Sequence, residues 1–375
     1  MGTRYKSDKQ AAVFCHEIAE VARQPLRDMA RTSSFLSVLC EGSTDVSICE
    51  QEVAFLQTAV NGEVRVQMLG IQGVACPNAQ SIHKAMEDSV TMYANISVEE
   101  FYSKLATLGL EGANVMIGAT GGVVVLLRQK QPALQGIHCF AHRLELAYKD
   151  TLKASPLFAK ANDLLLNLYL FYYNSAPMRS GLQETYNALK KTCHVPTRVG
   201  GTRWMPHTQK ALGILLKNYD AITMHLSQVA INGSSDQKSK VKGFLDKLRC
   251  PTIIKSYHLL WDVVLVLQRL SLRVQETKSS VSEIHSSLMF TVQELKKYQA
   301  SPGDKLATVK NLSSGDVFMG QSIVEKIGRG HPKSFDSTGS SSWVIFSSIW
   351  RNALQTRKNL SCRQPQCQFE DTAFL

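Results

Sequence analysis

The most constraining feature of this chain is residues 105–150, where short apolar runs alternate with helical segments. The runs at 105–110 (LATLGL) and 134–137 have the length and apolar content of buried strands. A glycine-bearing turn at 118–122 leads into VVVLLRQK, and a second helical segment follows His138. Strand, helix, strand and helix in succession predict an α/β fold.

Three further strands, at 35–40, 52–60 and 64–71, are predicted upstream of this stretch. Asn61 and Gly62 separate the last two, and this dipeptide between alternating apolar runs is a strong signal of a β-hairpin. Two helices follow, one at 78–93 and one capped by Ser97. The predicted order is therefore β-β-β-α-α-β-α-β-α, with the first three strands antiparallel.

Composition and periodicity divide the chain into four parts. Residues 7–29 have helical spacing, with an apolar side made of Ala12, Val13, Ile18, Ala19 and Val21. We expect an N-terminal helix in 1–31, an α/β domain in 32–155, an all-helical region in 156–300 and a Gly/Ser-rich, loosely ordered tail in 301–375. No run of about 18 apolar residues is present, so no membrane partner is expected.

The formal net charge of +11 is concentrated between residues 186 and 250. That region carries eleven basic residues against three acidic ones, which is typical of a nucleic-acid contact, with Lys190, Lys191 and Lys210 among the candidate ligands. A lysine-rich, solvated helical surface is an equally good interpretation of the charge alone. The nine scattered cysteines favour a reducing compartment over a disulfide framework.

Two pairs of residues are candidates for metal chemistry. Glu41 and Glu111 each follow a strand-like run and precede a glycine, and carboxylates at the ends of adjacent strands can hold divalent metal ions for phosphoryl transfer. Exposed glutamates at strand-to-loop boundaries are the plainer interpretation. Cys139 and His142, in the pattern C-x-x-H, make half of a zinc site, or else a small cysteine and a hydrogen-bonded histidine at a strand–helix junction.

The segment RVGGTRW places Trp204 beside Arg203, with Arg198 six residues before Trp204. An aromatic ring can stack on an unpaired base while arginines contact phosphates. A tryptophan that anchors the start of a helix explains the same pattern, so both interpretations stay open.

Four motifs, FLSVLCEGSTD, LEGANVMIGATGGV, IHCFAHRLELA and RVGGTRW, resemble in their order the hAT superfamily of DNA transposases. The chain is especially similar to domesticated vertebrate relatives of the zinc-finger and hAT-dimerisation type, over residues 35–270. The resemblance implies an RNase H-like mixed sheet followed by a large all-helical insertion region. It also implies that the following residues occupy family motif positions: Asp45, Cys139, His142, Arg203 and Trp204.

The sequence departs from the family where catalysis is concerned. Both catalytic aspartates of the family are replaced, by Glu41 and Glu111. The longer side chain moves the carboxylate by roughly 1.5 Å, and a misplacement on the order of 1 Å can cost about 100-fold in rate. The family's third acidic ligand, its C-terminal dimerisation segment and its N-terminal zinc finger are not found. These departures imply an incomplete RNase H-like domain that has no catalytic activity and binds no metal. Mg²⁺ would be needed only if residual nuclease activity exists.

We therefore expect a domesticated, catalytically inactive hAT transposase-like protein in the nucleus, with the cytoplasm as the alternative. Its expected partners are DNA, a protein or a second copy of the chain. Two other interpretations stay open, namely a residual metal-dependent nuclease that uses Glu41 and Glu111, and a helical scaffold that binds only proteins. Steep salt dependence of DNA binding would separate phosphate contact from a scaffold role.

Overall fold

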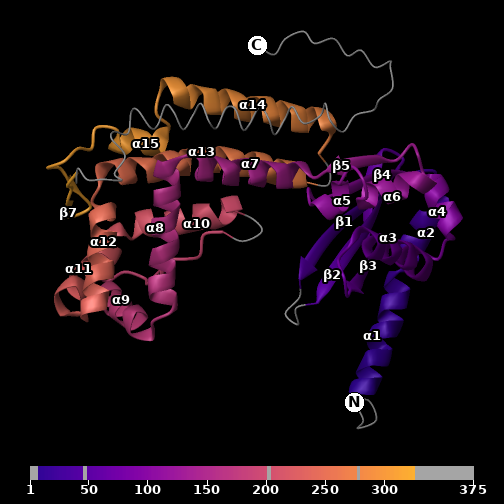
Figure 1. Cartoon of the computed structure of the whole chain (residues 1–375), viewed down its shortest axis with the longest axis horizontal. Helices are drawn as coiled ribbons and strands as arrows, with labels where there is room; N and C mark the ends of the chain where they lie inside the picture. The colour runs from indigo at the N-terminus through magenta and orange to yellow at the C-terminus, as the bar shows by residue number, and fades with distance from the viewer. Residues whose placement is uncertain (1–6, 45–48, 201–203, 277–278, 326–375) are drawn as a thin grey trace. The chain divides into compact units, whose positions relative to one another are not determined.

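The computed structural model describes residues 7–44, 49–200, 204–276 and 279–325 (Figure 1). The chain divides into two compact units, Met1–Arg143 and Leu144–Leu375. The border falls inside helix α7, Phe140–Ala154, whereas the sequence predicted it after residue 155. The first unit holds a mixed five-stranded sheet and its helices, and the second is largely helical.

The sheet of the first unit has the strand order β3-β2-β1-β4-β5. Its strands are β1 (Leu36–Thr44), β2 (Glu50–Val60), β3 (Glu63–Val74), β4 (Leu105–Leu110) and β5 (Gln135–His138). The first three strands are antiparallel, whereas β4 runs parallel to β1 and β5 parallel to β4. The predicted α/β order is confirmed, with one additional short helix between β4 and β5.

The turn between β2 and β3 has the geometry that its sequence predicts. Asn61 and Gly62 have φ angles of 52° and 80°, and Val60 pairs with Glu63 across the turn. Two consecutive positive φ angles are what a type I′ hairpin turn requires, and asparagine and glycine tolerate them best. The first strand differs from expectation, because β1 continues through Thr44 and therefore contains Glu41.

Helices pack their apolar sides on the sheet of the first unit. They are α2 (Gln24–Thr32), α3 (Ala79–Ser89), a π-helical turn (Val90–Ala94), α4 (Val98–Lys104), α5 (Asn114–Ile117) and α6 (Val123–Lys130), and α1 (Asp8–Ala22) precedes them. Alternate residues of the strands, such as Val38, Leu56 and Leu108, meet helix residues such as Ile82 and Phe101 in one buried core. Ser97 accepts a hydrogen bond from the backbone of Glu100, as its predicted capping role requires.

The predicted N-terminal helix is two helices, α1 and α2, and the apolar side of α1 is not buried. A turn at Arg23 separates the two helices, and Pro25 stands in the first turn of α2, where its lack of a backbone N–H does no harm. No residue of α1 is buried, and Ile18 and Val21 are 69% and 76% exposed. Burial begins in α2, with Leu26.

A carboxylate network joins the helices over this sheet. Glu87 of α3 accepts hydrogen bonds from the Tyr102 hydroxyl at 2.8 Å and from Lys130 Nζ at 2.7 Å. The Tyr102 hydroxyl also pairs with His83 Nε2 at 2.7 Å. Burial alone would raise the pKa of the Glu87 carboxyl, but the bonds from Lys130 and Tyr102 and the nearby positive charges outweigh it, so its pKa is lowered.

This network predicts a pH-dependent contribution to stability. Because the pKa of Glu87 is lower in the folded chain than in the unfolded chain, its stabilisation is complete above about pH 4.5 and is lost as the pH falls through the folded pKa. We expect Glu87→Gln to cost about 1 kcal/mol at neutral pH, allowing for partial solvent screening. Urea unfolding of both proteins at neutral and acidic pH measures the difference, and a difference that does not shrink in acid would contradict the assignment.

The second unit is built around one long helix, α13 (Pro251–Gln275), most of whose residues are buried. The others are α8 (Pro156–Tyr173), α9 (Ala176–Ala188), α10 (Trp204–Lys217), α11 (Tyr219–Asn232), α12 (Ser235–Leu248), α14 (Val281–Ala300) and α15 (Asp304–Val309). Helix α13 contacts α8, α10, α14 and α15. Among the described helices none is by itself long and apolar enough to cross a membrane, and α12 with α13 meets that test only as a pair bent by 68°.

Part of the predicted loosely ordered tail is folded. Residues 301–325 form α15 and a hairpin of β6 (Val317–Phe318) and β7 (Gln321–Ser322). Leu306, Val309 and Ile323 are buried, which offsets the entropic cost of ordering a Gly/Ser-rich segment. Residues 326–375 lie outside the described part of the chain.

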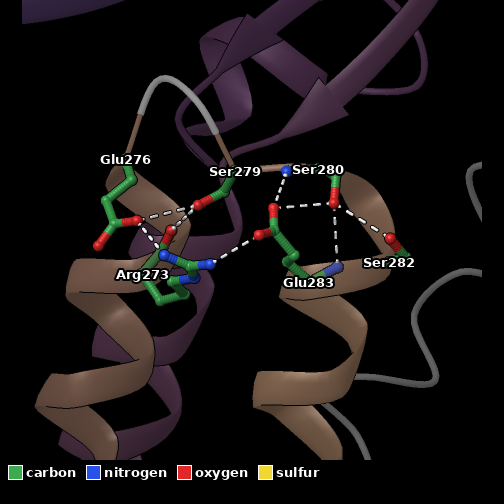
Figure 2. Close-up of polar contacts among 6 residues, drawn as sticks. All are labelled: Arg273, Glu276, Ser279, Ser280, Ser282 and Glu283. Atoms are coloured by element: carbon green, nitrogen blue, oxygen red, sulfur yellow. Dashed lines mark hydrogen bonds and ion pairs between the residues drawn. The ribbon is translucent and has the colours of Figure 1, made fainter.

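Polar contacts join the end of α13 to the start of α14 (Figure 2). Arg273 donates to Glu276 at 2.5 Å and to Glu283 at 3.0 Å. Glu283 also closes a capping box with Ser280, whose side chain accepts from the Glu283 backbone. One arginine therefore holds carboxylates on both sides of the connection, as Figure 2 shows.

Candidate functional site

The parallel pairing of β1 and β4 brings the two predicted carboxylates to the same level of the sheet. Leu39 lies opposite Gly109, so two residues later come Glu41, within β1, and Glu111, directly after β4. The Glu41 side chain is exposed and that of Glu111 is partly buried. Glu41 lies within β1 and pairs with Val53 of β2, so it is part of the sheet instead of the loop position that the sequence predicted.

A third carboxylate, Glu52 of β2, lies close to this level and was not predicted. Its side chain is buried, and Cys40 Sγ donates to its Oε2 at 3.2 Å. Burial, followed by the charge of Glu52 and then of Glu111 and Glu41, raises the pKa of the Cys40 thiol. Burial raises the pKa of Glu52 as well, and the charges of Glu50 and Glu111 add to the effect. Glu41, Glu52 and Glu111 together form what we call the acidic end of the sheet, and this environment disfavours further negative charge.

The glycines that follow Glu41 and Glu111, Gly42 and Gly112, each have a structural role. A Cβ atom at Gly42 would lie 3.0 Å from Oε1 of Glu52, and one at Gly112 would lie 2.3 Å from Cε1 of His138. Each glycine thus leaves room for a side chain from the neighbouring strand. The ring of His138, at the end of β5, lies against Gly112 just after Glu111.

His138 is a neutral histidine at this end of the sheet. Burial, together with the positive charges of His142 and Arg143, lowers its pKa to about 4. Its Nε2 atom is buried and has no hydrogen-bond partner among the described residues. The ring centroid of His142 lies 5.7 Å away. Sequence reasoning missed His138, because only the spatial approach to Gly112 distinguishes it.

We expect Gly112→Ala to displace the His138 ring. The added methyl group has no room, so the change should destabilise the first unit on the order of 2 kcal/mol, as overpacking does. The pKa of His138, followed by NMR of its ring protons, should rise towards 6.5 as the ring becomes solvated. Gly121→Ala is the matched control, since a Cβ atom there meets nothing within 4 Å. An unchanged His138 pKa in Gly112→Ala would refute the packing argument.

The predicted C-x-x-H pair is not completed to a metal site in the part of the chain that the structure describes. The backbone N–H of Cys139 donates to the Leu110 carbonyl at 2.9 Å, and its side chain is exposed. His142 is partly buried on the first turns of α7. The described residues contain no group of three or more His, Cys, Asp or Glu side chains placed to hold a metal ion. Asp45 lies outside them.

In the second unit, Trp204 begins α10 with its ring only partly buried. The Nζ atom of Lys149, from α7, lies 4.8 Å from the ring centroid, within the range of a cation–π interaction. The buried carboxylate of Glu145 accepts the Met205 backbone N–H at 2.9 Å and so satisfies one free amide at the helix start. Trp204 therefore presents an accessible ring beside a cation, while Glu145 fixes the start of the helix.

The predicted basic residues have different environments. Lys190, Arg198 and Lys210 are exposed and form no ion pair within the described ranges. Lys191 is paired with Asp220 at 2.5 Å, which makes it a weaker candidate for phosphate contact. Arg203 lies outside the described residues.

No protein-family model matches this chain. The two features of the described chain that bear on function are the carboxylates at the end of the sheet and the lysine beside the ring of Trp204.

Proposed function

We propose that this chain derives from a hAT-superfamily DNA transposase, has lost catalytic activity and keeps the ability to bind DNA. The strand order β3-β2-β1-β4-β5, with β4 and β5 parallel to β1, supports an RNase H-like domain. Glutamates on β1 and after β4 stand where the family resemblance implies metal-ligating aspartates. The largely helical second unit fits the insertion region that the resemblance implies.

The environment of Trp204 carries the binding proposal. Its partly exposed ring can stack on an unpaired base, which is typically worth about 1–3 kcal/mol per base. Lys149 over the ring and the exposed Arg198 offer positive charge for the adjoining phosphates. A hairpin or single-stranded end presents both an unpaired base and a phosphate, so such DNA should bind more tightly than plain duplex.

The loss of catalysis is supported by the chemistry of the acidic end. The longer side chains of Glu41 and Glu111 alter a geometry that two-metal catalysis needs at about 3.5–4 Å between ions. A residual metal-dependent nuclease is the alternative. It predicts nicking of supercoiled plasmid in Mg²⁺ or Mn²⁺ that disappears in Glu41→Gln. We expect no such nicking, and metal-dependent activity abolished by that substitution would overturn the proposed loss.

DNA binding is tested by titrating the full chain with hairpin and duplex DNA at several salt concentrations. If phosphates are contacted, log K falls linearly with log salt, by about 0.9 for each phosphate neutralised. Arg198→Ala should flatten that slope by roughly one unit. Lys84→Ala is the matched control, because Lys84 is an exposed lysine of the first unit.

Trp204→Ala separates stacking from a purely structural role. A stacked ring predicts a loss of about 1–3 kcal/mol on hairpin DNA with an unchanged salt slope and an unchanged melting temperature. Tyr173→Ala, which removes an aromatic ring that is 60% exposed, is the control and should bind normally. Binding that does not depend on salt or on Trp204 would support the protein-interaction scaffold instead.

A further inference from the structure

A cavity of about 690 Å³ opens between α10, α13 and α15 in the second unit. Volumes of about 300–1,000 Å³ are typical of sites for small ligands. Three elements far apart in the sequence contribute to its lining, so it forms only when the helices pack. The side chains that matter for its chemistry are Lys210, Lys217, Lys305, Trp261 and His194.

The lining of this cavity is positively charged. Lys210 and Lys217 come from α10 and Lys305 from α15, and no aspartate or glutamate is among the described residues that line the cavity. None of the three lysines forms an ion pair with another described residue. The buried acid nearby, Asp262, accepts the backbone N–H groups of Lys305 and Leu306 at 3.0 and 2.9 Å. Its charge is therefore already engaged, and the lysines are left to bind an anion.

The cavity also has an aromatic wall. Trp261 of α13 is partly exposed and lines it. The ring edge reaches the backbone of α10 at Gly213, where a Cβ atom would lie 2.9 Å from the indole. Glycine inside a helix costs about 0.5–1 kcal/mol relative to alanine. At this position the absent side chain allows the close approach of the indole.

Helical spacing directs one face of α10 into the cavity. Lys210, Gly213 and Lys217 are separated by three and four residues, so they lie on one side of the helix. That face places a lysine on each side of the glycine against which the indole packs. Gln209 and Thr308 add neutral hydrogen-bonding groups to the lining. A flat, partly apolar group and a strong anion are thus accommodated together.

We propose that this cavity binds a nucleotide, with the base against Trp261 and the phosphates among Lys210, Lys217 and Lys305. The nucleotide is either free or the phosphorylated terminal nucleotide of a DNA strand, since both present the same chemistry. An apolar ligand would leave three ammonium groups without a counter-charge, and inorganic phosphate would leave the indole wall unused. Both therefore fit the lining less well than a nucleotide does.

The test is calorimetric titration of the full chain with ADP, AMP, adenosine and pyrophosphate. We expect ADP to bind more tightly than AMP, and adenosine and pyrophosphate each to bind at least tenfold more weakly than ADP. Lys217→Gln and Lys305→Gln should each weaken ADP about tenfold, the equivalent of about 1.4 kcal/mol. Lys242→Gln, which removes an exposed lysine of α12 outside the lining, is the control and should bind as wild type does.

The aromatic wall is tested separately. Trp261→Leu should weaken ADP about tenfold and leave pyrophosphate unchanged, whereas Trp261→Phe should keep most of the affinity. Melting curves of every variant check that the fold is intact. No binding of ADP at millimolar concentration would overturn the proposal, as would ADP binding that is insensitive to Lys217, Lys305 and Trp261.

A pair of single-stranded oligonucleotides, with and without a 5′-phosphate, distinguishes the two sources of the nucleotide. A preference for the phosphorylated strand that is lost in Lys217→Gln assigns the cavity to a strand end, and ADP binding without such a preference assigns it to the free nucleotide. Trp204→Ala should leave ADP binding intact. If DNA binding at Trp204 is absent, ADP binding is still expected, and if the cavity binds no nucleotide, only the ADP titration fails. The two proposals can therefore be refuted separately.

Discussion

Tyr257→Ala is expected to destabilise the second unit by about 3–5 kcal/mol, the loss typical of removing a buried aromatic side chain. Tyr257 is fully buried in the first half of α13, the helix that contacts most of the others in this unit. Its hydroxyl donates to the Ala161 carbonyl of α8 at 2.9 Å. The alanine variant loses both the packing of the ring and this bond, and thermal unfolding followed by circular dichroism measures the loss.

Tyr257→Phe separates the two contributions. The ring and its contacts remain, so only the hydrogen bond is lost, and the expected cost is about 1 kcal/mol. If both variants lost the same stability, the hydroxyl would be the dominant contact and the packing argument would be wrong. If neither lost stability, α13 would not be the centre of the unit.

Asp262→Ala is expected to cost on the order of 3 kcal/mol and to release the start of α15. The buried carboxylate receives two backbone N–H groups, and hydrogen bonds to charged groups contribute about 1.5–3 kcal/mol each. Gly303 is fitted to this contact, because a Cβ atom there would lie 2.6 Å from the Asp262 carboxylate. Alanine at 262 leaves the amides of Lys305 and Leu306 without their acceptor.

Hydrogen exchange at the amides of Lys305 and Leu306 measures this release directly. We expect much faster exchange in Asp262→Ala and an intermediate rate in Asp262→Asn, which keeps one acceptor oxygen. Protection equal to that of the wild type in the alanine variant would show that α15 is held by Leu306 and Val309 alone. Because α15 supplies Lys305 to the proposed nucleotide cavity, the alanine variant should also bind ADP more weakly.

Several elements follow from local sequence because their causes are local. Asn61 and Gly62 accept the positive φ angles of a tight hairpin, and Ser97 caps the helix that begins at the next residue. The run of residues 105–110 is β4 to the residue, and the glycines before Val123 end where α6 begins. Alternation of apolar residues predicted β2 and β3, because the pleat exposes and buries side chains in turn, and short apolar runs predicted β1, β4 and β5.

Two sequence-based predictions, for residues 7–29 and for residues after 301, differ from the structure. The spacing of residues 7–29 predicted one helix, but the structure has two, and α1 buries no residue because helical periodicity does not say what covers the apolar side. Glycine and serine after residue 301 predicted loose order, but Leu306 and Ile323 are buried there. A few apolar residues are enough to order such a segment when they pack against another helix, here α13, whose Asp262 also accepts backbone N–H groups of α15.

The sequence alone determined the order of strands and helices and the concentration of positive charge between residues 186 and 250. Only the tertiary structure decided which side chains meet. Glu52 reaches Cys40 through strand register, His138 of β5 reaches Gly112 just after the neighbouring strand β4, and Trp261 meets Gly213 between helices. The physical reason is that local propensity acts over a few residues, whereas these contacts join positions that only packing of the whole unit brings together.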